Sequence, residues 1–74
     1  MISYDPLLKT MKDKNITAYK LVQMGFSEST FYRIKRVNGQ ENYGSIDVIN
    51  QLCNLLDCDV NEIIEHIPDK KSKN

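Results

Sequence analysis

Apolar residues recur at helical spacing along most of the chain, and short polar breaks separate the stretches. The first stretch begins at Asp5, whose carboxylate can cap free amides, and a proline suited to the first helical turn follows it. Leu7, Leu8 and Met11 form an apolar face with lysines on the opposite side. Because Asn15 interrupts the pattern, we expect the first helix to end there.

A glycine turn separates the next two predicted helices. Thr17 can cap the second helix, which places Leu21 and Met24 inward. Gly25 then ends this helix, because glycine enters the left-handed region at little cost. Phe26 fills the connection with an apolar side chain.

The third helix is predicted over residues 28–37, with Ser27 as its cap. Phe31 and Ile34 are three residues apart, so they share one face and predict its buried side. Polar and charged side chains occupy the rest of its circumference. Asn38 and the following glycine end the helix and open a polar loop that extends to residue 44.

Two more helices and two short extended segments complete the prediction. Ser45 can cap a fourth helix, and its apolar stripe consists of Ile46, Ile49, Leu52, Cys53 and Leu56. Asp59 can cap a short fifth helix, and its apolar residues are Val60, Ile63 and Ile64, with Pro68 ending the structure. Residues 2–4 and 65–67 mix polar and β-favouring types, so we expect them to pair. The predicted fold class is all-α, a five-helix domain with a short terminal β pairing.

Length and composition place this fold in a single small domain. Seventy-four residues suffice for one domain with a thin core, which we assign to residues 1–69, and residues 70–74 form a flexible basic tail. No apolar run approaches the roughly 20 residues that a membrane span requires, and the first residues lack the pattern of a secretory signal. We therefore expect a cytoplasmic protein.

The formal net charge is zero, but the charges are unevenly distributed. Residues 1–44 carry seven lysines or arginines against four acids, a net charge of +3, whereas residues 45–74 carry three against six, a net charge of −3. A basic first half can face phosphate while the acidic half points away. Zero net charge nevertheless argues against a strongly basic nucleic-acid binder.

Catalytic and metal-binding chemistry is not indicated. Cys53 and Cys58 lack CxxC spacing, and His66 cannot complete a zinc site with them, so buried reduced thiols are the better interpretation. The chain has no Ser–His–Asp set and no phosphate-binding glycine loop. We expect no enzyme activity, no cofactor, no metal and no small-molecule substrate.

The stretch from Thr17 to Arg36 carries the functional prediction. Two helices joined by so tight a glycine turn cross steeply, which holds the outer face of the second one away from the body. A helix fits the major groove of B-DNA, where arginine can contact guanine bidentately and glutamate can accept from cytosine. Serine and threonine, including Thr30, suit base edges or phosphate, whereas Lys35 and Arg36 near the helix end suit phosphate.

These residues resemble a known family, the Cro and lambda-repressor-like (XRE-type) helix-turn-helix regulators. The resemblance lies in residues 16–21, in Met24-Gly25-Phe26-Ser27-Glu28-Ser29-Thr30-Phe31 and in Ile34. Residues 46–65, with Leu52-Cys53-Asn54-Leu55-Leu56-Asp57-Cys58-Asp59-Val60, resemble the next two helices of a small stand-alone branch. The resemblance implies a lambda-repressor-like fold of five helices, binding of double-stranded DNA through the third helix and regulation of transcription. Many relatives bind as dimers, so we expect a homodimer.

The resemblance also assigns residues to roles. It implies that the groove-facing positions are Ser27, Glu28, Ser29, Tyr32 and Arg33. Thr17 and Asn38 match positions that contact phosphate in relatives. Two features depart from the family's pattern: a leucine stands four residues before Gly25 instead of five, and the loop over residues 38–44 is long.

Each of these roles has a plainer alternative. Arg33 can be a solvated surface charge, Glu28 can support the helix dipole, and Tyr32 can cover the edge of the core. At the level of the whole protein, the alternative is a protein-interaction module that keeps the fold without binding DNA. A protein-binding helix would expose an apolar patch where residues 27–36 are polar.

Overall fold

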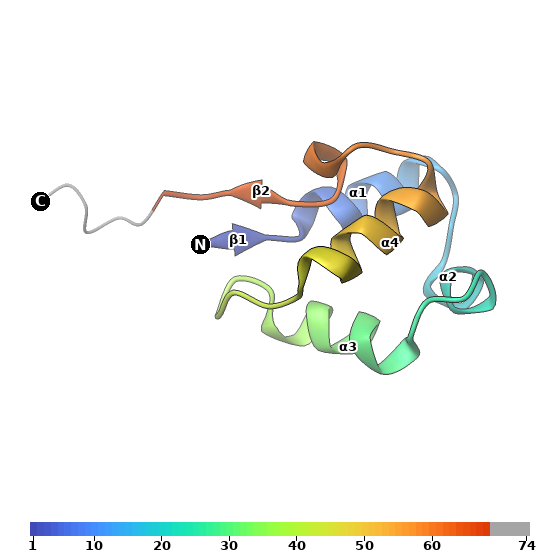
Figure 1. Cartoon of the computed structure of the whole chain (residues 1–74), viewed down its shortest axis with the longest axis horizontal. Coiled ribbons are helices and arrows are strands. Elements are labelled where there is room, and N and C mark those ends of the chain that lie inside the picture. Colours follow the sequence, from blue (N-terminus) through green and yellow to red (C-terminus); the bar gives the residue numbers. More distant parts are fainter. Residues whose placement is uncertain (69–74) are drawn as a thin grey trace, which may run out of the picture.

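The computed structural model describes residues 1–68, and within them four α-helices and one 3-10 turn form a mostly helical domain. A two-stranded antiparallel pair joins the first residues to the last described ones (Figure 1). In chain order the elements are β1 (Ile2–Ser3), α1 (Asp5–Asp13), α2 (Ala18–Gln23), α3 (Glu28–Val37), α4 (Ile46–Leu56), the 3-10 turn η1 (Val60–Glu62) and β2 (Glu65–His66). The predicted flexible tail, residues 70–74, lies outside the described residues, as does the end of the predicted domain at residue 69.

One hydrophobic cluster holds the helices together. In the described part of the chain, its buried side chains are Tyr4, Leu7, Met11, Leu21, Phe26, Phe31, Ile34, Leu52, Leu56 and Ile63. Every α-helix contributes to this cluster, so no helix has a stable position without the others. The predicted apolar stripe of α4 is correct at Leu52 and Leu56 but wrong at Ile46, which is 80% exposed. Ile46 is the first residue of α4 and precedes the turns that reach the core.

The start of α1 differs from the prediction by one position. Tyr4 occupies the N-cap position without a side-chain cap, and Asp5 is the first helical residue, followed by the proline. The hydroxyl of Ser3 accepts a hydrogen bond from the Asp5 amide at 3.1 Å. Tyr4 is buried, so its packing decides where the chain turns into the helix.

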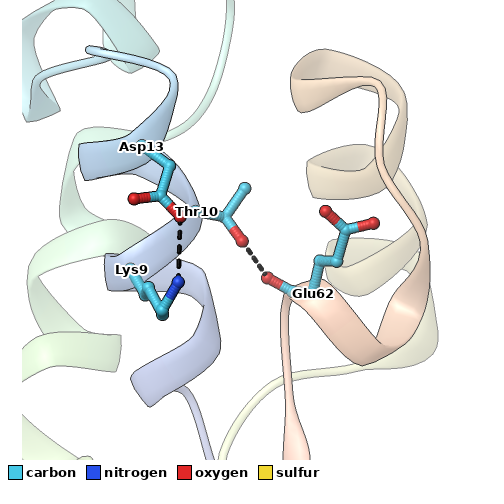
Figure 2. Close-up of polar contacts among 4 residues, drawn as sticks. All are labelled: Lys9, Thr10, Asp13 and Glu62. Atoms are coloured by element: carbon cyan, nitrogen blue, oxygen red, sulfur yellow. Dashed lines mark hydrogen bonds and ion pairs between the residues drawn. The ribbon is translucent and has the colours of Figure 1, made fainter.

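The predicted fifth helix is wrong in length, because the segment forms only the single turn η1. Its last carbonyl, that of Glu62, bonds to α1 instead of continuing a helix. The hydroxyl of Thr10 donates to the Glu62 carbonyl at 2.7 Å, next to the Lys9–Asp13 ion pair on the surface of α1 (Figure 2). The amide of Leu7 donates to the carbonyl of Ile63, the residue after η1, at 3.1 Å. These contacts fasten η1 to α1.

The expected pairing of the terminal segments is confirmed, although each strand has only two residues. Ile2 lies opposite His66 and Ser3 opposite Glu65 in an antiparallel register. The pairing continues one residue past the strands: the amide of Ile67 donates to the Met1 carbonyl at 2.8 Å. The strand pair projects from the end of the helical body opposite α2 (Figure 1).

Candidate nucleic-acid interface

The first half of the candidate interface is α2 with its cap. The hydroxyl of Thr17 accepts a hydrogen bond from the Lys20 amide at 3.1 Å, which satisfies one of the free donors at the start of the helix. Leu21 is fully buried and anchors the helix to the core. With six residues α2 is short, so this anchor and the following turn determine its direction.

The turn between α2 and α3 depends on Gly25. Its φ angle is +111°, in a region that side chains disfavour. Phe26 follows and is buried, and its amide donates to the Leu21 carbonyl at 3.2 Å. The side-chain amide of Gln51, on α4, donates to the Gly25 carbonyl at 3.3 Å. The turn is therefore held from the core side by Phe26 and from α4 by Gln51.

The third helix presents one buried and one open face, as the spacing of its residues predicts. Phe31 and Ile34 are buried, whereas Glu28, Ser29 and Arg33 are exposed. In Figure 1, α3 runs along the lower edge of the molecule, with its outer side turned away from α1 and α4. The outer side of α3 is thus a polar helical surface that another molecule can approach.

The start of α3 holds two hydroxyl groups close together. The hydroxyl of Ser27 accepts from the Thr30 amide at 3.3 Å and so caps the helix. It also lies 3.2 Å from the hydroxyl of Ser29, in a hydrogen bond that either group can donate. Because a hydroxyl both donates and accepts, this pair has capacity left for a partner in front of the helix.

Tyr32 lies between the core and the open face. Its ring packs edge-on against Phe31, with centroids 5.5 Å apart, yet the residue is 48% exposed. The ammonium group of Lys35 lies 5.8 Å from the Phe31 ring and 6.0 Å from the Tyr32 ring. Tyr32 therefore covers the edge of the core and also reaches the surface.

Arg33 is exposed, but its guanidinium group contacts two residues of the following loop, Glu41 and Tyr43. One terminal nitrogen of its guanidinium group, Nη2, is 3.6 Å from a carboxylate oxygen of Glu41. Its central carbon lies 5.0 Å from the centroid of the Tyr43 ring. Neither Glu41 nor Tyr43 was assigned to the site from the sequence, since no local pattern relates position 33 to a loop eight to ten residues later.

The loop over residues 38–44 is docked against the start of the chain. The Asn38 side chain accepts from the Tyr4 amide at 2.7 Å and donates to the Asp5 carboxylate at 2.8 Å. The Asn42 side chain accepts from the Ile2 amide at 2.7 Å. The side chain of Asn38, a predicted phosphate contact, is thus already engaged in fastening α3 to the N-terminal segment.

Tyr4 completes the attachment of the loop. Its hydroxyl donates to the Tyr43 carbonyl at 2.7 Å and lies so close to Gly44 that a β-carbon there would collide with it. Gly44 also has a φ angle of +108°, which favours glycine. Burial raises the pKa of the Tyr4 phenol above its usual value, and the nearby Tyr43 raises it further.

The predicted phosphate contacts lie at the ends of α2 and α3. Thr17 is exposed at the start of α2, and Thr30 is half-buried in the first turn of α3. Lys35 and Arg36 are exposed in the last turn of α3. The structure thus places cationic groups at one end of the open helix face and hydroxyl groups at the other.

A shallow hollow of about 230 Å³ opens between α2 and α3. Ala18, Tyr19 and Val22 line it from α2, and Glu28 and Tyr32 line it from α3. Tyr19 is 73% exposed, so much of its ring is accessible at this edge. The hollow adds apolar surface next to the polar outer side of α3.

Cys53 lies in the last turn of α4 and Cys58 two residues past its end, and both are free thiols. The amide of Cys58 donates to the Cys53 carbonyl at 3.1 Å across the left-handed residue Asp57, an arrangement that commonly ends helices. Burial raises the pKa of the Cys58 thiol, and the nearby Cys53 raises it further. Both are half-buried and pack against the core, so burial is less complete than the sequence suggested.

Neither a metal-binding cluster nor a membrane-spanning helix occurs among the described residues. Over residues 1–68, no group of three or more histidine, cysteine or acidic side chains is arranged to hold a metal ion. In the same range, no helix is long and apolar enough to cross a membrane.

Two helices crossing at a glycine turn, with the open side of the second one polar, define a helix-turn-helix domain. The chain belongs to the family of Cro/C1-type helix-turn-helix DNA-binding domains, whose model matches residues 7–69. This is a family of DNA-binding regulators and not of enzymes.

A solved structure supports this assignment. The chain is similar to the crystal structure of the transcriptional regulator VanUg, with 33% sequence identity and a TM-score of 0.72. The similarity covers 92% of this chain and 87% of that one. No curated protein sequence matches the chain significantly.

Proposed function

We propose that this protein binds duplex DNA sequence-specifically, with α3 in the major groove, and represses transcription. The observation that carries the proposal is that α3 has one buried and one open face. Phe31 and Ile34 are buried, whereas the opposite side is polar and open. A helix held in this way can enter the major groove without displacing any part of its own domain.

The proposed base-reading residues lie on the first two turns of α3. Arg33 donates to guanine, Glu28 accepts from cytosine, and the Ser27 and Ser29 hydroxyls serve either kind of base edge. Tyr32 contacts DNA with the exposed part of its ring. These assignments are supported by the exposure of all five residues.

The proposed phosphate contacts position the helix in the groove. Thr17 and Thr30 offer hydroxyls at the starts of α2 and α3, and Lys35 and Arg36 offer charge at the end of α3. Asn38 also belongs to this set, although its side chain already makes two internal hydrogen bonds. Phosphate contacts fix register and orientation but carry no sequence information directly.

The protein acts in this proposal as a homodimer on a palindromic site in the cytoplasm. A single small module covers only roughly 600–1,000 Å² of surface on DNA, so two copies make a more specific complex. The exposed apolar residues Ile46, Val60 and Ile67 on the surface of α4, η1 and the end of β2 support this part of the proposal.

The rival function is a protein-interaction module on the same fold. The hollow between α2 and α3, with the exposed rings of Tyr19 and Tyr32, favours it, as does a net charge of zero. Retention on heparin or mixed-sequence DNA at low salt separates the two functions, because an interaction module without DNA binding passes straight through.

Selection of bound sites from random duplexes tests the proposal and supplies the operator sequence. We then expect Arg33→Ala to weaken binding by about 1–3 kcal/mol and to relax the base preference at one position. Lys9→Ala is the matched control, because it removes one positive charge from the outer side of α1 and should leave base preference intact.

Salt dependence tests the phosphate contacts in the same assay. A dimer with several cationic contacts should lose roughly 100-fold in affinity between about 50 and 200 mM salt. If no duplex is enriched, or if Arg33→Ala binds the selected site unchanged, the proposed reading face is wrong.

A further inference from the structure

The guanidinium group of Arg33 has two partners within its own chain. Glu41 approaches the edge of the group, with 3.6 Å between Nη2 and the carboxylate oxygen. The Tyr43 ring lies 5.0 Å from the guanidinium carbon. The side chains of Arg33 and Glu41 are each about half exposed, at 48% and 52%, so the ion pair lies at the surface of α3 where DNA would approach.

Two hydrogen bonds to the start of the chain hold the loop beside Arg33. The carbonyl of Tyr43 accepts from the Tyr4 hydroxyl at 2.7 Å, and Asn42 accepts from the Ile2 amide at 2.7 Å. Tyr4 is 2% exposed, so the first of these bonds is anchored in the core. Glu41 and Tyr43 are consequently held beside α3 by residues that lie about forty positions away in the chain.

We propose that Glu41 competes with DNA for the guanidinium group of Arg33, and that Tyr43 positions this group beside α3. The inference rests on the proposed function, since it concerns how the same helix face engages DNA. Glu41 and Tyr43 are positioning residues, because their effect on base recognition is exerted through Arg33.

The chemistry of the guanidinium group supports an exchange of partners. A bidentate contact with guanine uses two N–H donors on one edge of the planar group. An edge directed at the Glu41 carboxylate is unavailable to guanine until that ion pair opens. A surface ion pair is weak enough to open, and a cognate guanine in the groove offers two acceptors in its place.

The Tyr43 ring acts on a different part of the same group. A cation over an aromatic face is attracted by the ring while its in-plane N–H donors remain free. Arg33 can therefore keep Tyr43 as a neighbour while it exchanges Glu41 for guanine. The Arg33 side chain is then partly ordered before DNA binds, which lowers the entropy cost of binding.

The decisive experiment compares Glu41→Gln in two backgrounds on the selected duplex. In the otherwise unchanged protein, we expect the affinity to rise about three- to tenfold, because the competing carboxylate is gone and its repulsion of phosphate is removed. In the Arg33→Ala background only the repulsion remains, so the gain should be at least about twofold smaller, as expected for a surface ion pair.

The outcomes separate the inference from the proposed function. An equal gain in both backgrounds, or no gain in either, overturns the competition between Glu41 and DNA while leaving DNA binding established. Failure of the unchanged protein to bind any selected duplex overturns the proposed function and, with it, the inference. Equal melting temperatures of the variants exclude a loss of fold as the cause.

Tyr43 is tested with a conservative and a disruptive variant. Tyr43→Phe keeps the aromatic face and should retain the base preference at the position read by Arg33. Tyr43→Leu removes the face and should weaken that preference at least about threefold, while the preference at other positions is unchanged. A uniform loss of affinity with Tyr43→Leu, with the base preference intact, overturns the positioning role.

Discussion

Tyr4 connects three parts of the molecule through one side chain and its own backbone. Its ring is in the core, its hydroxyl holds the Tyr43 carbonyl, and its amide is held by Asn38. Gly44 lies against the Tyr4 hydroxyl, where a β-carbon would collide with it. Tyr4, near the start of the chain, therefore helps to fix where the loop lies beside α3.

Removal of the Tyr4 hydroxyl tests this role. Tyr4→Phe should lower the free energy of unfolding by about 1 kcal/mol near pH 7, because the Tyr43 carbonyl loses its donor. Denaturant unfolding monitored by circular dichroism measures this difference. Tyr19→Phe is the matched control, since the same atom is removed from an exposed ring. Its hydroxyl accepts a hydrogen bond from Gln23 at the surface, where water can replace it, so the cost should be close to zero.

The pH dependence of the same variant has a definite sign. The Tyr4 pKa is raised in the folded protein, so the phenol ionises first in the unfolded chain, at its usual pKa of about 10. Its contribution is fully present below pH 10 and is lost as the pH rises toward the folded pKa. The stability advantage of the unchanged protein over Tyr4→Phe should therefore shrink above pH 10. A constant difference between pH 8 and 11 would contradict the assigned burial effect.

At the scale of elements, each helix of the helix-turn-helix pair begins at a hydroxyl cap. Thr17 and Ser27 both accept from the amide three residues later, and Ser45 does the same for α4. Ser27 has a second proposed role, because it lies at the end of α3 that would meet base edges. Its contributions to helix stability and to DNA binding can be separated by mutation.

Ser27→Ala and Ser27→Asp make this separation. Ser27→Ala removes the cap and should lower stability by about 1 kcal/mol. Ser27→Asp keeps an acceptor for the Thr30 amide at the positive end of the helix, so stability should be retained. On the selected duplex, Ser27→Asp should bind more weakly than Ser27→Ala, because its carboxylate repels phosphate. Equal binding by the two variants would place position 27 away from DNA.

At the level of the whole molecule, the exposed aliphatic residues bear on assembly. In the part of the chain that the structure describes, Ile46, Val60 and Ile67 are 80%, 52% and 43% exposed. None of them lies on α3, so an assembly contact through them leaves the proposed reading face free. This separation is compatible with two copies on one duplex, each with its own α3 in the groove.

The proposed homodimer has a direct test in solution. Sedimentation at micromolar concentration should show a dimer, either alone or with a palindromic duplex that carries two selected half-sites. Ile46→Ser should weaken dimer formation if α4 supplies the contact, whereas the stability of the monomer should change little because Ile46 is exposed. Monomers only, both with and without DNA, would exclude the dimer.

Much of the helix-turn-helix was predictable because its signals are local. Gly25, the caps at Thr17 and Ser27, and the pair Phe31 and Ile34 each act within about four residues of the chain. The burial and exposure that these signals predict agree with the structure. The start of α1 was predicted less well. The packing of the Tyr4 ring outweighs the tendency of Asp5 to cap the helix, so Asp5 becomes the first helical residue.

The four α-helices and the two faces of α3 can be predicted from the sequence, since helix capping, glycine turns and apolar spacing operate between near neighbours. The surroundings of Arg33, the two internal hydrogen bonds of Asn38 and the shortness of η1 are set by the folded chain. These features depend on contacts between residues far apart in the chain, such as the 52-residue separation of Thr10 and Glu62. No local pattern encodes such contacts, because they form only when the shared core brings the elements together.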